Sequence, residues 1–544
     1  GVCTSRQAYD YLNGQVQVDD PFQINGMDET VIRLLWAIDH HEPVAVYGDY
    51  DVDGVTATAL LTQVLRRFGA VVTPYIPNRF DEGYGLNMEA LEGLAGQGIR
   101  VVVTVDCGIR SPREAERAEA LGIDLIISDH HQPGEELPDG FTVLCPKRGG
   151  DEYPDKDLAG VGIAYKIAQA LAKRRPEAGV RAEDWLDLVA LGTVADVVPL
   201  TGENRSLVRR GLQTMRSSLM QGRPGLYSLA NVARVKVGRI CATDIAFILG
   251  PRLNAAGRLD TAHAALNLLL AESVEQAGLL SQNLDNQNRE RQDLTRKTQE
   301  EVLRLVQARD GAQDPAQGAA QILFAFDRNF NPGIVGLVAS RLVEMFYRPA
   351  IVGHEEDGYT RASCRSIPEF HITRALDECR ELLERHGGHA LAAGFTVKNE
   401  NVPELTARLR AIASRELSAL DLHPVLRADL EIPLARLRAD YVETVLHHLD
   451  MLQPTGQGNP EAMFVSRGLE VVRSWTVGTE KQHLRLKLRA GNIMFDAIAF
   501  RQGHWADAMP KAVDLLYQLE KNEYNGYESL QLNVRDLKPA GEPD

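Results

Sequence analysis

Short apolar runs alternate with amphipathic stretches over the first third of the chain. The apolar runs cover residues 44–48, 71–77, 100–106, 124–128 and 142–144. Helix-like spacing of apolar residues occupies the intervals between several of them, at 55–69, from about 87 and at 111–122, and also at 31–38 ahead of the first run. Apolar strands that alternate with amphipathic helices predict a largely parallel sheet with helices on both faces.

The pattern changes twice further along the chain. Residues 273–308 contain no proline and one glycine and are charged along most of their middle, so we expect a solvent-exposed helix of about 50 Å. A loop-like stretch follows at 308–321, and then a second α/β pattern begins. Between about 426 and 539, short alternating segments separated by Gly and Asn turns predict a small antiparallel barrel, most simply an OB-fold.

These changes divide the chain into units. A length of 544 residues exceeds what one hydrophobic core usually organises. We expect an α/β protein with a parallel-sheet domain at 1–270, a connecting long helix at 271–312, a smaller α/β domain at 313–424 and a β-barrel at 425–544.

Composition narrows the possible functions. The chain carries 59 Lys and Arg against 75 Asp and Glu, a formal net charge of −16, which argues against non-specific coating of nucleic acid. A nucleic-acid enzyme still fits, because it needs only a local basic track. The first residues show no basic segment followed by an apolar one, and no apolar run is long enough to span a bilayer, so we expect a cytoplasmic protein without membrane contact. The six cysteines form no CxxC pair, which indicates reduced thiols.

Three aspartates crowd together directly after the run at 44–48. Asp49, Asp51 and Asp53 alternate along the chain, with Gly48 and Gly54 on either side. Carboxylates packed this closely repel one another and would take up protons unless a cation compensates them. A solvated acidic turn is the alternative.

Other acids and imidazoles follow later strands. Asp106 ends one apolar run, and Asp129, His130 and His131 follow another. Ligands of an open parallel sheet bind at the carboxyl ends of its strands, so we expect these side chains to converge on one edge. Asp196 interrupts an apolar stretch, where an aspartate is rare unless it is paired or binds a metal.

Oxygen ligands from aspartate with nitrogen from histidine suit Mn²⁺ or Mg²⁺. The candidates exceed what one ion needs. They would serve two ions about 3.5 to 4 Å apart, the arrangement that hydrolyses phosphoesters, with Asp106 as the bridge. Of His130 and His131, one would bind metal and the other would contact a substrate phosphate or act as a general acid; a helix-capping or core pair is the alternative.

Six segments in this order resemble the DHH phosphoesterase superfamily, and in particular its branch of bacterial exonucleases specific for single strands. They are GDYDVDG, PNRFDEGYGLN, TVDCG, SDHH, LAGVGIAYK and GTVADVVPL, which begin at residues 48, 77, 104, 128, 158 and 192. The resemblance implies the metal ligands Asp51, Asp53, Asp106, His130 and Asp196. It also implies that His131 is a catalytic or phosphate-contacting residue and that Asp49 is a supporting acid.

The resemblance extends to DNA contacts in three regions. The string at 250–262 matches a loop of these exonucleases that contacts the DNA backbone, which points to Arg252, Asn254 and Arg258; a helix terminus with surface arginines is the alternative. The second α/β unit resembles the DHHA1 domain, which grips the nucleic acid, and the glycine-framed stretch at 387–395 suggests a loop that approaches phosphate. The residues implied in this second unit are Arg361, Arg365, Ser366, Gly388 and His389.

The barrel is the third region. An OB-fold holds a single strand by stacking bases on aromatic side chains beside a basic groove. We expect Trp475, Lys487 and Arg501 to contact the strand, although each could instead belong to the core or to the solvated rim.

The chain departs from the family pattern at five positions. Tyr47 stands where several relatives have a metal-binding histidine, Cys145 replaces an asparagine, Phe330 and Asn331 replace a Trp-His pair, and Cys364 replaces a glycine. The last three departures put the grip on the substrate in doubt, but not the metal centre.

Taken together, the residues and the resemblance predict a metal-dependent exonuclease that degrades single-stranded DNA 5′ to 3′ in repair and recombination, with two Mn²⁺ or Mg²⁺ ions. The cleavage polarity rests on the resemblance alone. A single-strand-binding protein and a helicase are the implied partners, and we expect a monomer. Two alternatives are a phosphodiesterase of the same superfamily acting on short oligonucleotides or cyclic dinucleotides, and a replisome scaffold with an inactive metal site.

Overall fold

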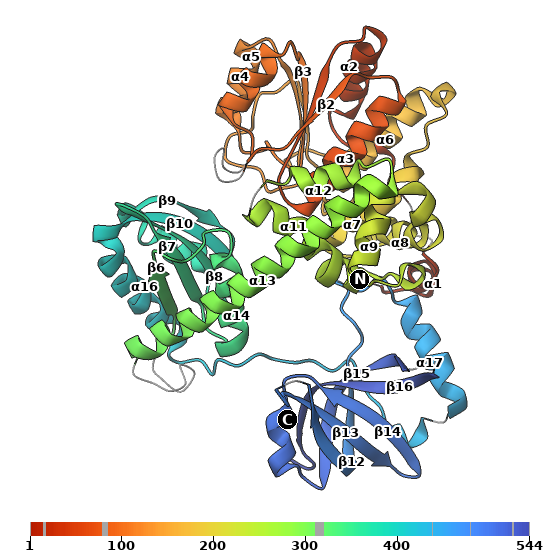
Figure 1. Cartoon of the computed structure of the whole chain (residues 1–544), viewed down its shortest axis with the longest axis vertical. Helices are drawn as coiled ribbons and strands as arrows, with labels where there is room; N and C mark the ends of the chain where they lie inside the picture. The colour runs from red at the N-terminus through yellow and green to blue at the C-terminus, as the bar shows by residue number, and fades with distance from the viewer. Residues whose placement is uncertain are drawn as a thin grey trace.

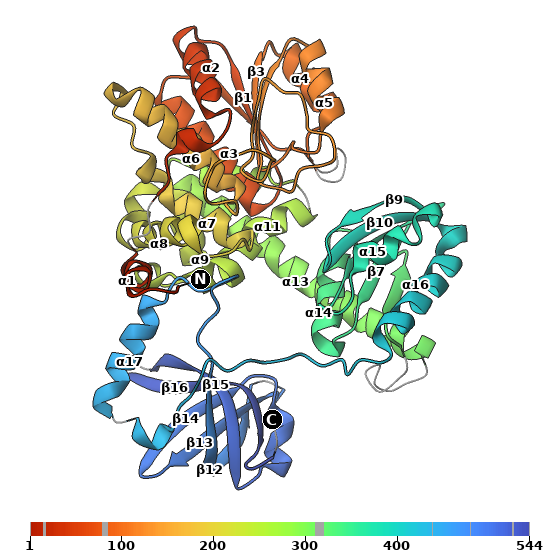
Figure 2. The same cartoon turned by 180° about the vertical axis from the view of Figure 1, so that it is seen from behind.

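The computed structural model describes residues 2–14, 18–78, 85–259, 261–310, 320–437, 439–478, 480–524 and 527–542. The chain forms two α/β bodies and a barrel (Figure 1). The first body lies at the top of this view, the second is teal and the barrel is blue. The reverse view in Figure 2 shows the same separation, with the long helix α13 running from the first body to the second.

A parallel sheet organises the first body. Its strands are arranged in the order β2-β1-β3-β4-β5, and every pairing is parallel, as predicted. The strands are β1 (Val44–Gly48), β2 (Val72–Tyr75), β3 (Val101–Val105), β4 (Asp124–Ser128) and β5 (Thr142–Leu144). All residues of β1 and β3 are buried, because both faces of the sheet are covered.

Helices cover the two faces of this sheet unequally. Alternate strand residues such as Val44 and Val46 pack on a large core with α2, α3 and α6, whereas Ala45 and Tyr47 pack on a smaller one with α4 and α5. The first body contains the helices α1 (Ser5–Asn13), α2 (Met27–Asp39), α3 (Val52–Arg67), α4 (Met88–Gly96), α5 (Pro112–Ala120), α6 (Gly160–Arg174), α7 (Leu186–Ala195), α8 (Gly202–Gly222), α9 (Pro224–Val232), α10 (Ala242–Asp244), the π-helical η5 (Ile245–Leu249), α11 (Gly250–Leu259) and α12 (His263–Leu269).

The expected DNA-contacting loop at 250–262 is instead mostly helical. Residues 250–259 form α11, directly after the π-helical turn η5. Gly257 allows close packing, because a Cβ atom there would lie 2.9 Å from the carbonyl oxygen of Tyr50. Asp260, in the same string, lies outside the described residues.

Helix α13 (Val274–Asp310) has 37 residues, which corresponds to about 55 Å. Its existence was predicted, but its expected exposure along the whole length is wrong. Ser281, Asp285, Asn288, Thr295 and Thr298 are buried. Helix α13 packs against α9, α11, α12 and α14, and because these buried positions are polar, the sequence shows no apolar stripe that would mark the buried face. Much of the loop-like stretch that follows, residues 311–319, lies outside the described part of the chain.

The second body contains a mixed sheet in the order β6-β7-β8-β10-β9, in which only β6 and β7 pair in parallel. The expected glycine-framed phosphate loop is largely an antiparallel hairpin, with Gly388 at the end of β9 and His389 in the turn. The elements are β6 (Leu323–Asp327), α14 (Val335–Phe346), β7 (Ala350–Glu355), β8 (Tyr359–Arg365), α15 (Ile372–Asp377), β9 (Leu383–Gly388), β10 (Ala392–Lys398) and α16 (Val402–Leu417).

The third body is a barrel. Its strands follow the order β12-β13-β14-β16-β15, and the pairing of β12 with β15 closes it. The prediction of an all-antiparallel barrel is wrong in one respect, since β14 and β16 pair in parallel. The elements are β11 (Leu430–Glu431), α17 (Ala439–Met451), β12 (Phe464–Val477), β13 (His483–Ala490), β14 (Ile493–Ala499), β15 (Ala512–Tyr524) and β16 (Tyr527–Pro539).

Two further observations concern the whole chain. Among the described residues, no helix is both long and apolar enough to cross a membrane. All six cysteines are free thiols, as their spacing predicted, and Cys107, Cys145, Cys364 and Cys379 are buried.

Candidate metal centre and cleft

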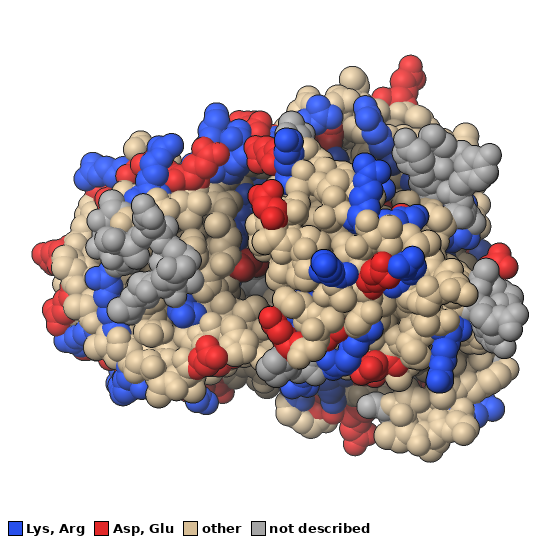
Figure 3. All heavy atoms as spheres, turned by 90° about the horizontal axis from the view of Figure 1, so that it is seen from below, with Lys and Arg blue, Asp and Glu red and all other residues tan. Residues whose placement is uncertain are grey.

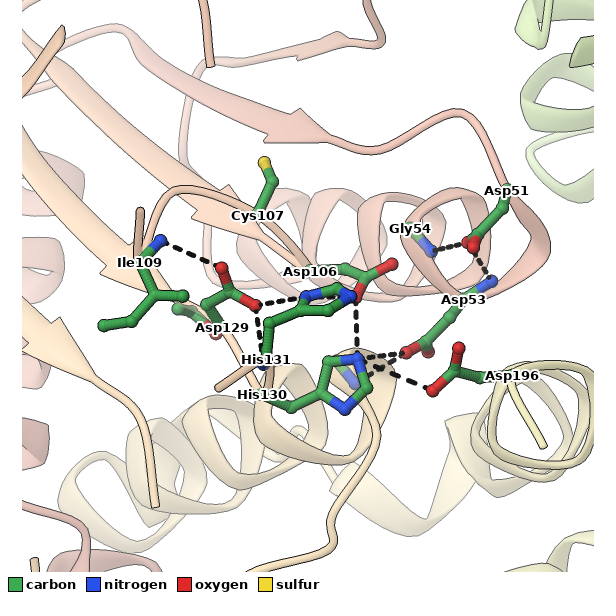
Figure 4. A network of polar contacts seen from close by, with 12 residues as sticks. Asp51, Asp53, Gly54, Asp106, Cys107, Ile109, Asp129, His130, His131 and Asp196 are labelled. Carbon is green, nitrogen blue, oxygen red and sulfur yellow. Dashed lines mark hydrogen bonds and ion pairs between the residues drawn. The ribbon is translucent and has the colours of Figure 1, made fainter. Parts of the chain in front are cut away.

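The carboxyl edge of the first sheet gathers the predicted ligands (Figure 4). Asp49 and Asp51 lie between β1 and α3, Asp53 lies in the first turn of α3, and Asp106 directly follows β3. His130 follows β4 by two residues, and Asp196 caps the carboxyl end of α7. Segments far apart in sequence therefore meet where a parallel sheet exposes its strand ends.

His130 lies at the centre of the cluster. Its Nε2 atom is 3.1 Å from Asp106 Oδ1, 3.5 Å from Asp196 Oδ2 and 3.9 Å from Asp53 Oδ2. Nε2 of His130 and Oδ1 of Asp106 are buried, and neither makes a hydrogen bond of good geometry with any described residue. Buried polar atoms normally have partners, so these two are placed for a ligand that the protein does not supply.

The ligand atoms form overlapping groups of three. Their members are Asp53, His130 and Asp196 in one group, Asp49, Asp51 and Asp106 in a second, and Asp106, His130 and His131 in a third. Within each group the candidate atoms lie within 4.8 Å of one another. Asp106 is common to the second and third groups and His130 to the first and third, so the three groups form one continuous set of candidate ligands.

Backbone amides hold Asp53 in place. Its Oδ2 accepts a hydrogen bond from Gly160 N at 2.6 Å, and its Oδ1 accepts one from Val161 N at 2.8 Å. Both donors belong to the first turn of α6, where the helix dipole favours an anion. A Cβ atom at Gly160 would lie 2.6 Å from Asp106 Cβ, so only glycine lets this helix end approach. The motif at 158–166 thereby acquires a physical role.

The neighbouring acid, Asp51, begins α3. Its Oδ1 accepts hydrogen bonds from Asp53 N at 2.9 Å and from Gly54 N at 3.1 Å. Asn254 of α11 reaches the same turn, because its Oδ1 accepts a hydrogen bond from Val52 N at 3.2 Å. These bonds fix the turn but leave the second carboxylate oxygen of Asp51 available to a ligand.

Strained backbone marks two of the ligand segments. Asp106 has φ of 64°, and Val197, which directly follows Asp196, has φ of 62°. Non-glycine residues rarely adopt this left-handed region, and a β-branched valine does so least of all. Strain of this kind persists only where the surrounding structure enforces it, and it is concentrated at functional sites.

The pKa values show that burial and mutual repulsion favour the protonated form of these acids. Burial, followed by repulsion from Asp51, raises the pKa of Asp53 to about 7. Burial and then Asp53 raise the pKa of Asp196 to about 9, and burial with the neighbouring acids also raises the pKa of Asp106. Burial lowers the pKa of His130 to about 3, so its imidazole is neutral and able to coordinate a metal. Crowded carboxylates beside a neutral imidazole fit Mn²⁺ or Mg²⁺.

Asp129 is a site residue that the sequence-based selection omitted. Its Oδ1 contacts His131 Nδ1 at 2.8 Å and accepts a hydrogen bond from His131 N at 3.0 Å, while its Oδ2 accepts one from Ile109 N at 2.9 Å. Burial opposes a charge on His131, but the bond to Asp129 and the negative charges of Asp129, Asp51 and Asp53 together outweigh it, so the pKa of His131 is raised. The position of Asp129 directly before two histidines at a strand end could have revealed this role.

A pocket of about 300 Å³ opens beside the cluster and lies between the first body and the second. Its lining residues are Tyr50, Asp51, Ala195, Asp196, Asn254, Gly257, Arg258, Pro332, Gly333, Gly336, Ser363 and Arg365. Arg258 also joins the two bodies, since its Nη1 donates to Gly333 O at 3.2 Å. The acids, an asparagine and two arginines therefore face one cavity, whose size and polarity suit a phosphate-bearing group.

Of the predicted DNA contacts, Asn254, Arg258 and Arg365 line this pocket. Arg252 is engaged elsewhere, because its side chain donates to the buried Asp285 at 2.9 Å and to Ile248 O at 2.7 Å. Arg361 faces Glu356 at 3.5 Å.

Ser366 is turned away from the pocket. It is buried, and its hydroxyl donates to Phe370 O at 2.6 Å. Ser363 lines the pocket instead, and the alternation of side chains along β8, with Arg361, Ser363 and Arg365 on one face, was the signal for it. A DNA contact by Ser366 stays a prediction that this geometry does not favour.

The predicted contacts on the barrel lie on its strands or just beyond them. Trp475 in β12 has the Arg473 guanidinium 5.2 Å from its ring centroid. Lys487 in β13 donates to both carboxylate oxygens of Asp496 at 2.9 Å, which partly neutralises it. Arg501 follows β14 with φ of 61°. These positions leave the strand-binding role of the three residues untested.

The departures from the family pattern are accommodated locally. The Tyr47 hydroxyl donates to Gly85 O at 3.0 Å and so braces the segment after residue 84; residues 79–84 of the motif at 77–87 lie outside the described part. Asn331 Oδ1 accepts a hydrogen bond from Gly333 N at 2.7 Å and shapes the pocket wall. The remaining three departures are all buried in the core: Cys145, Phe330 and Cys364.

The fold and this edge cluster define a DHH-type phosphoesterase. The DHH family N-terminal domain matches residues 43–193, the DHHA1 domain matches 319–415 and the RecJ OB domain matches 428–536. The chain belongs to the RecJ family of single-stranded-DNA-specific exonucleases.

Individual relatives support this membership. The chain is 38% identical to the single-stranded-DNA-specific exonuclease RecJ of Bacillus subtilis over 95% of its own length and 64% of the relative's, so that relative has a considerable further part. It is 34% identical to RecJ of Escherichia coli over 95% and 91% of the two chains. The crystal structure of RecJ with Mn²⁺ from Thermus thermophilus superposes with a TM-score of 0.81 at 30% identity, covering 96% of this chain and 72% of that one.

Proposed function

We propose that this chain is a metal-dependent exonuclease that hydrolyses single-stranded DNA from its 5′ end in repair and recombination. The observation that carries the proposal is the set of candidate metal ligands around Asp106 and His130, which lies beside a nucleotide-sized pocket. Family membership supports the substrate, because the relatives are named as single-stranded-DNA-specific exonucleases. The 5′ to 3′ polarity rests on the family resemblance of the sequence motifs.

The ligand set supports a mechanism with two ions. Asp53, His130 and Asp196 would hold one Mn²⁺ or Mg²⁺ ion, and Asp49, Asp51 and Asp106 the other. Asp106 Oδ1 lies 3.1 Å from His130 Nε2, so the two ligand groups are adjacent. Asp49 thus moves from a supporting acid to a candidate ligand. When bound, the ions would supply an activated water molecule and would polarise the phosphoryl oxygens.

The protein's own groups prepare the substrate. Arg258 and Arg365 in the pocket would pair with non-bridging phosphate oxygens, since guanidinium groups match phosphate geometry. The raised pKa of His131 favours the protonated imidazole, which would donate its proton to the phosphate or to the leaving oxygen. Asp129 fixes the orientation of that ring.

End-labelled substrates test this function. With Mn²⁺ present, a single strand should lose a 5′ label before a 3′ label, and a blunt duplex should resist cleavage. Asp106→Asn should lower the rate by about 10² or more, because it removes charge from the shared position. Simultaneous loss of both labels, cleavage limited to dinucleotides, or an active Asp106→Asn variant would each contradict the proposal.

A further inference from the structure

A loop between α17 and the barrel lies directly against the segment that follows Asp196. This loop, residues 454–459, approaches residues 199–201 backbone to backbone: Leu200 N donates to Gln457 O at 2.7 Å. Gly456 and Gly458 allow the approach. A Cβ atom would lie 2.8 Å from Leu200 Cδ1 at the first and 3.2 Å from Pro199 Cβ at the second, where φ is also 70°.

Arg205 of α8 holds the chain around the loop. It is 2% exposed, and its Nη1 donates to Leu452 O at 2.8 Å and Pro454 O at 3.1 Å, while its Nη2 donates to Met451 O at 3.1 Å. No carboxylate forms an ion pair with it among the described residues. A buried cation is costly unless its hydrogen bonds are satisfied, so the guanidinium strongly favours the conformation that presents these carbonyls.

Asn459 and Tyr11 complete the anchorage. The Tyr11 hydroxyl donates to Asn459 Oδ1 at 2.5 Å, and Asn459 Nδ2 donates to Pro454 O at 2.7 Å. The Tyr11 ring lies 3.9 Å from the Arg205 guanidinium. Helix α1, α8 and the loop are therefore tied together by side chains far apart in the sequence, and the loop is fixed on the first body (Figure 2).

The loop supports a strained segment. Asp196 ends α7, and the next residue, Val197, is in the left-handed region and 64% exposed, so little packing holds it directly. Val198 then packs in the hydrophobic core of the first body, and Pro199 and Leu200 meet the loop. Helix α7 on one side, and the packing of Val198 together with the loop on the other, thus fix the backbone that presents the Asp196 carboxylate.

We propose that residues 454–459 act as a positioning element for Asp196, so that a segment next to the barrel sets the geometry of the metal centre. The inference rests on the proposed function insofar as Asp196 binds a metal ion. Loosening the loop should weaken metal binding even when no DNA is present. A loop that served only to attach the barrel would affect the binding of long strands and nothing else.

Asn459→Ala tests the proposal in the full chain. We expect about tenfold weaker Mn²⁺ binding by calorimetry without DNA, in the range found when the partners of a metal ligand are removed. On a short oligonucleotide, the Mn²⁺ concentration for half-maximal activity should rise to the same extent, whereas kcat at saturating Mn²⁺ should recover to within about threefold. Amide exchange should accelerate at residues 197–201. Arg209→Met is the matched control, because Arg209 lies one helical turn from Arg205 and donates to Leu12 O rather than to the loop.

A second variant keeps the test decisive if Asn459→Ala folds poorly. Gly456→Ala adds one methyl group against Leu200 without removing a hydrogen bond, and should also weaken Mn²⁺ binding. Unchanged Mn²⁺ affinity in a folded variant, with weaker binding of long strands only, would overturn the inference and leave the proposed function intact. A wild-type chain that binds no Mn²⁺ would overturn both.

Discussion

Asp53 illustrates how one buried residue is prepared for a cation. Two amides of α6 hold its oxygens, burial and Asp51 raise its pKa to about 7, and His130 Nε2 lies 3.9 Å away. Without a cation the folded chain must either protonate this carboxyl group or bear an uncompensated buried charge. The same holds for Asp106 and Asp196, so metal binding should be coupled to the stability of the fold.

This coupling predicts a pH-dependent response to metal. The folded-state pKa values of Asp53 and Asp196 are raised from 3.8 to about 7 and about 9. Their contribution to stability is therefore complete only below about pH 4 and is lost as the pH rises through those two values. His130, with its lowered pKa, acts in the opposite direction, but only below 6.5.

Between pH 6.5 and 9 the melting temperature of the metal-free chain should therefore fall. Added Mg²⁺ should raise it more at pH 9 than at pH 6.5, because a bound ion replaces the lost protons. Melting curves with EDTA and with Mg²⁺ at the two pH values measure the difference. An equal Mg²⁺ effect at both would show that these carboxylates are not the ligands.

Asp129 offers a second prediction at this scale. Asp129→Asn keeps the shape of the side chain but loses the negative charge that orients His131 and favours its protonated form. We therefore expect kcat to fall by about 10- to 100-fold while Mn²⁺ affinity changes little. Kinetics on a short single strand, beside calorimetric Mn²⁺ titration, separate the two effects. A loss of Mn²⁺ affinity as large as the loss of kcat would argue that Asp129 supports the ligands instead.

Among the helices and strands, the amino-terminal end of α6 places the tightest constraint on the metal site. Gly160→Ala would place a methyl group 2.6 Å from Asp106 Cβ, so it should destabilise the fold by about 1–3 kcal/mol and reduce hydrolysis strongly. Gly162→Ala, two residues further along the same helix, meets Leu158 Cβ at 3.4 Å and should be tolerated. Denaturant unfolding and rates for both variants provide the test; equal behaviour would contradict the assigned role of Gly160.

The type of an element was predictable where one periodicity of apolar residues dominated its segment. The strands of the first sheet and the helices beside it follow the apolar pattern, since both faces of the sheet are buried. Helix α11 was missed because its string resembles a DNA-contacting loop of the family, whereas in this fold Gly257 lets the helix approach the backbone of Tyr50. The buried face of α13 carries polar residues such as Asp285, which pairs with Arg252, and no hydrophobicity pattern could reveal it.

The candidate site was predictable to a similar extent. Acids and imidazoles at strand ends predicted the cluster, because the carboxyl ends of parallel strands lie at the same edge of the sheet. Contacts that depend on the arrangement of domains were beyond the sequence: Arg258 bonded to Gly333, and the loop at 454–459 against Leu200. Nothing local distinguishes such residues from ordinary surface positions.

At the scale of the whole molecule, charge is mixed rather than segregated. Figure 3 shows acidic and basic side chains interspersed on the face seen from below, with a hollow between the two lobes. Together with the net charge of −16, this favours guidance of a strand by local contacts over a broad basic surface. The barrel's aromatic and basic residues are the natural candidates.

Trp475→Ala tests the barrel while leaving the loop at 454–459 in place, which a deletion from residue 426 onwards would not. Loss of one stacked base should weaken binding of a long single strand by about 1–3 kcal/mol and leave cleavage of a short oligonucleotide unchanged. Trp475→Phe is the control that retains a ring. Equal binding of the long strand by wild type and Trp475→Ala would remove this residue from the strand path.

In the proposed mechanism two cations share the site around Asp106, and a Mn²⁺ titration of the DNA-free chain counts them. We predict two bound Mn²⁺ ions per chain in the wild type, and loss or strong weakening of both in Asp106→Asn, because that carboxylate belongs to two of the three ligand groups. A single ion per chain, or two ions that bind Asp106→Asn as tightly as the wild type, would contradict the two-ion mechanism.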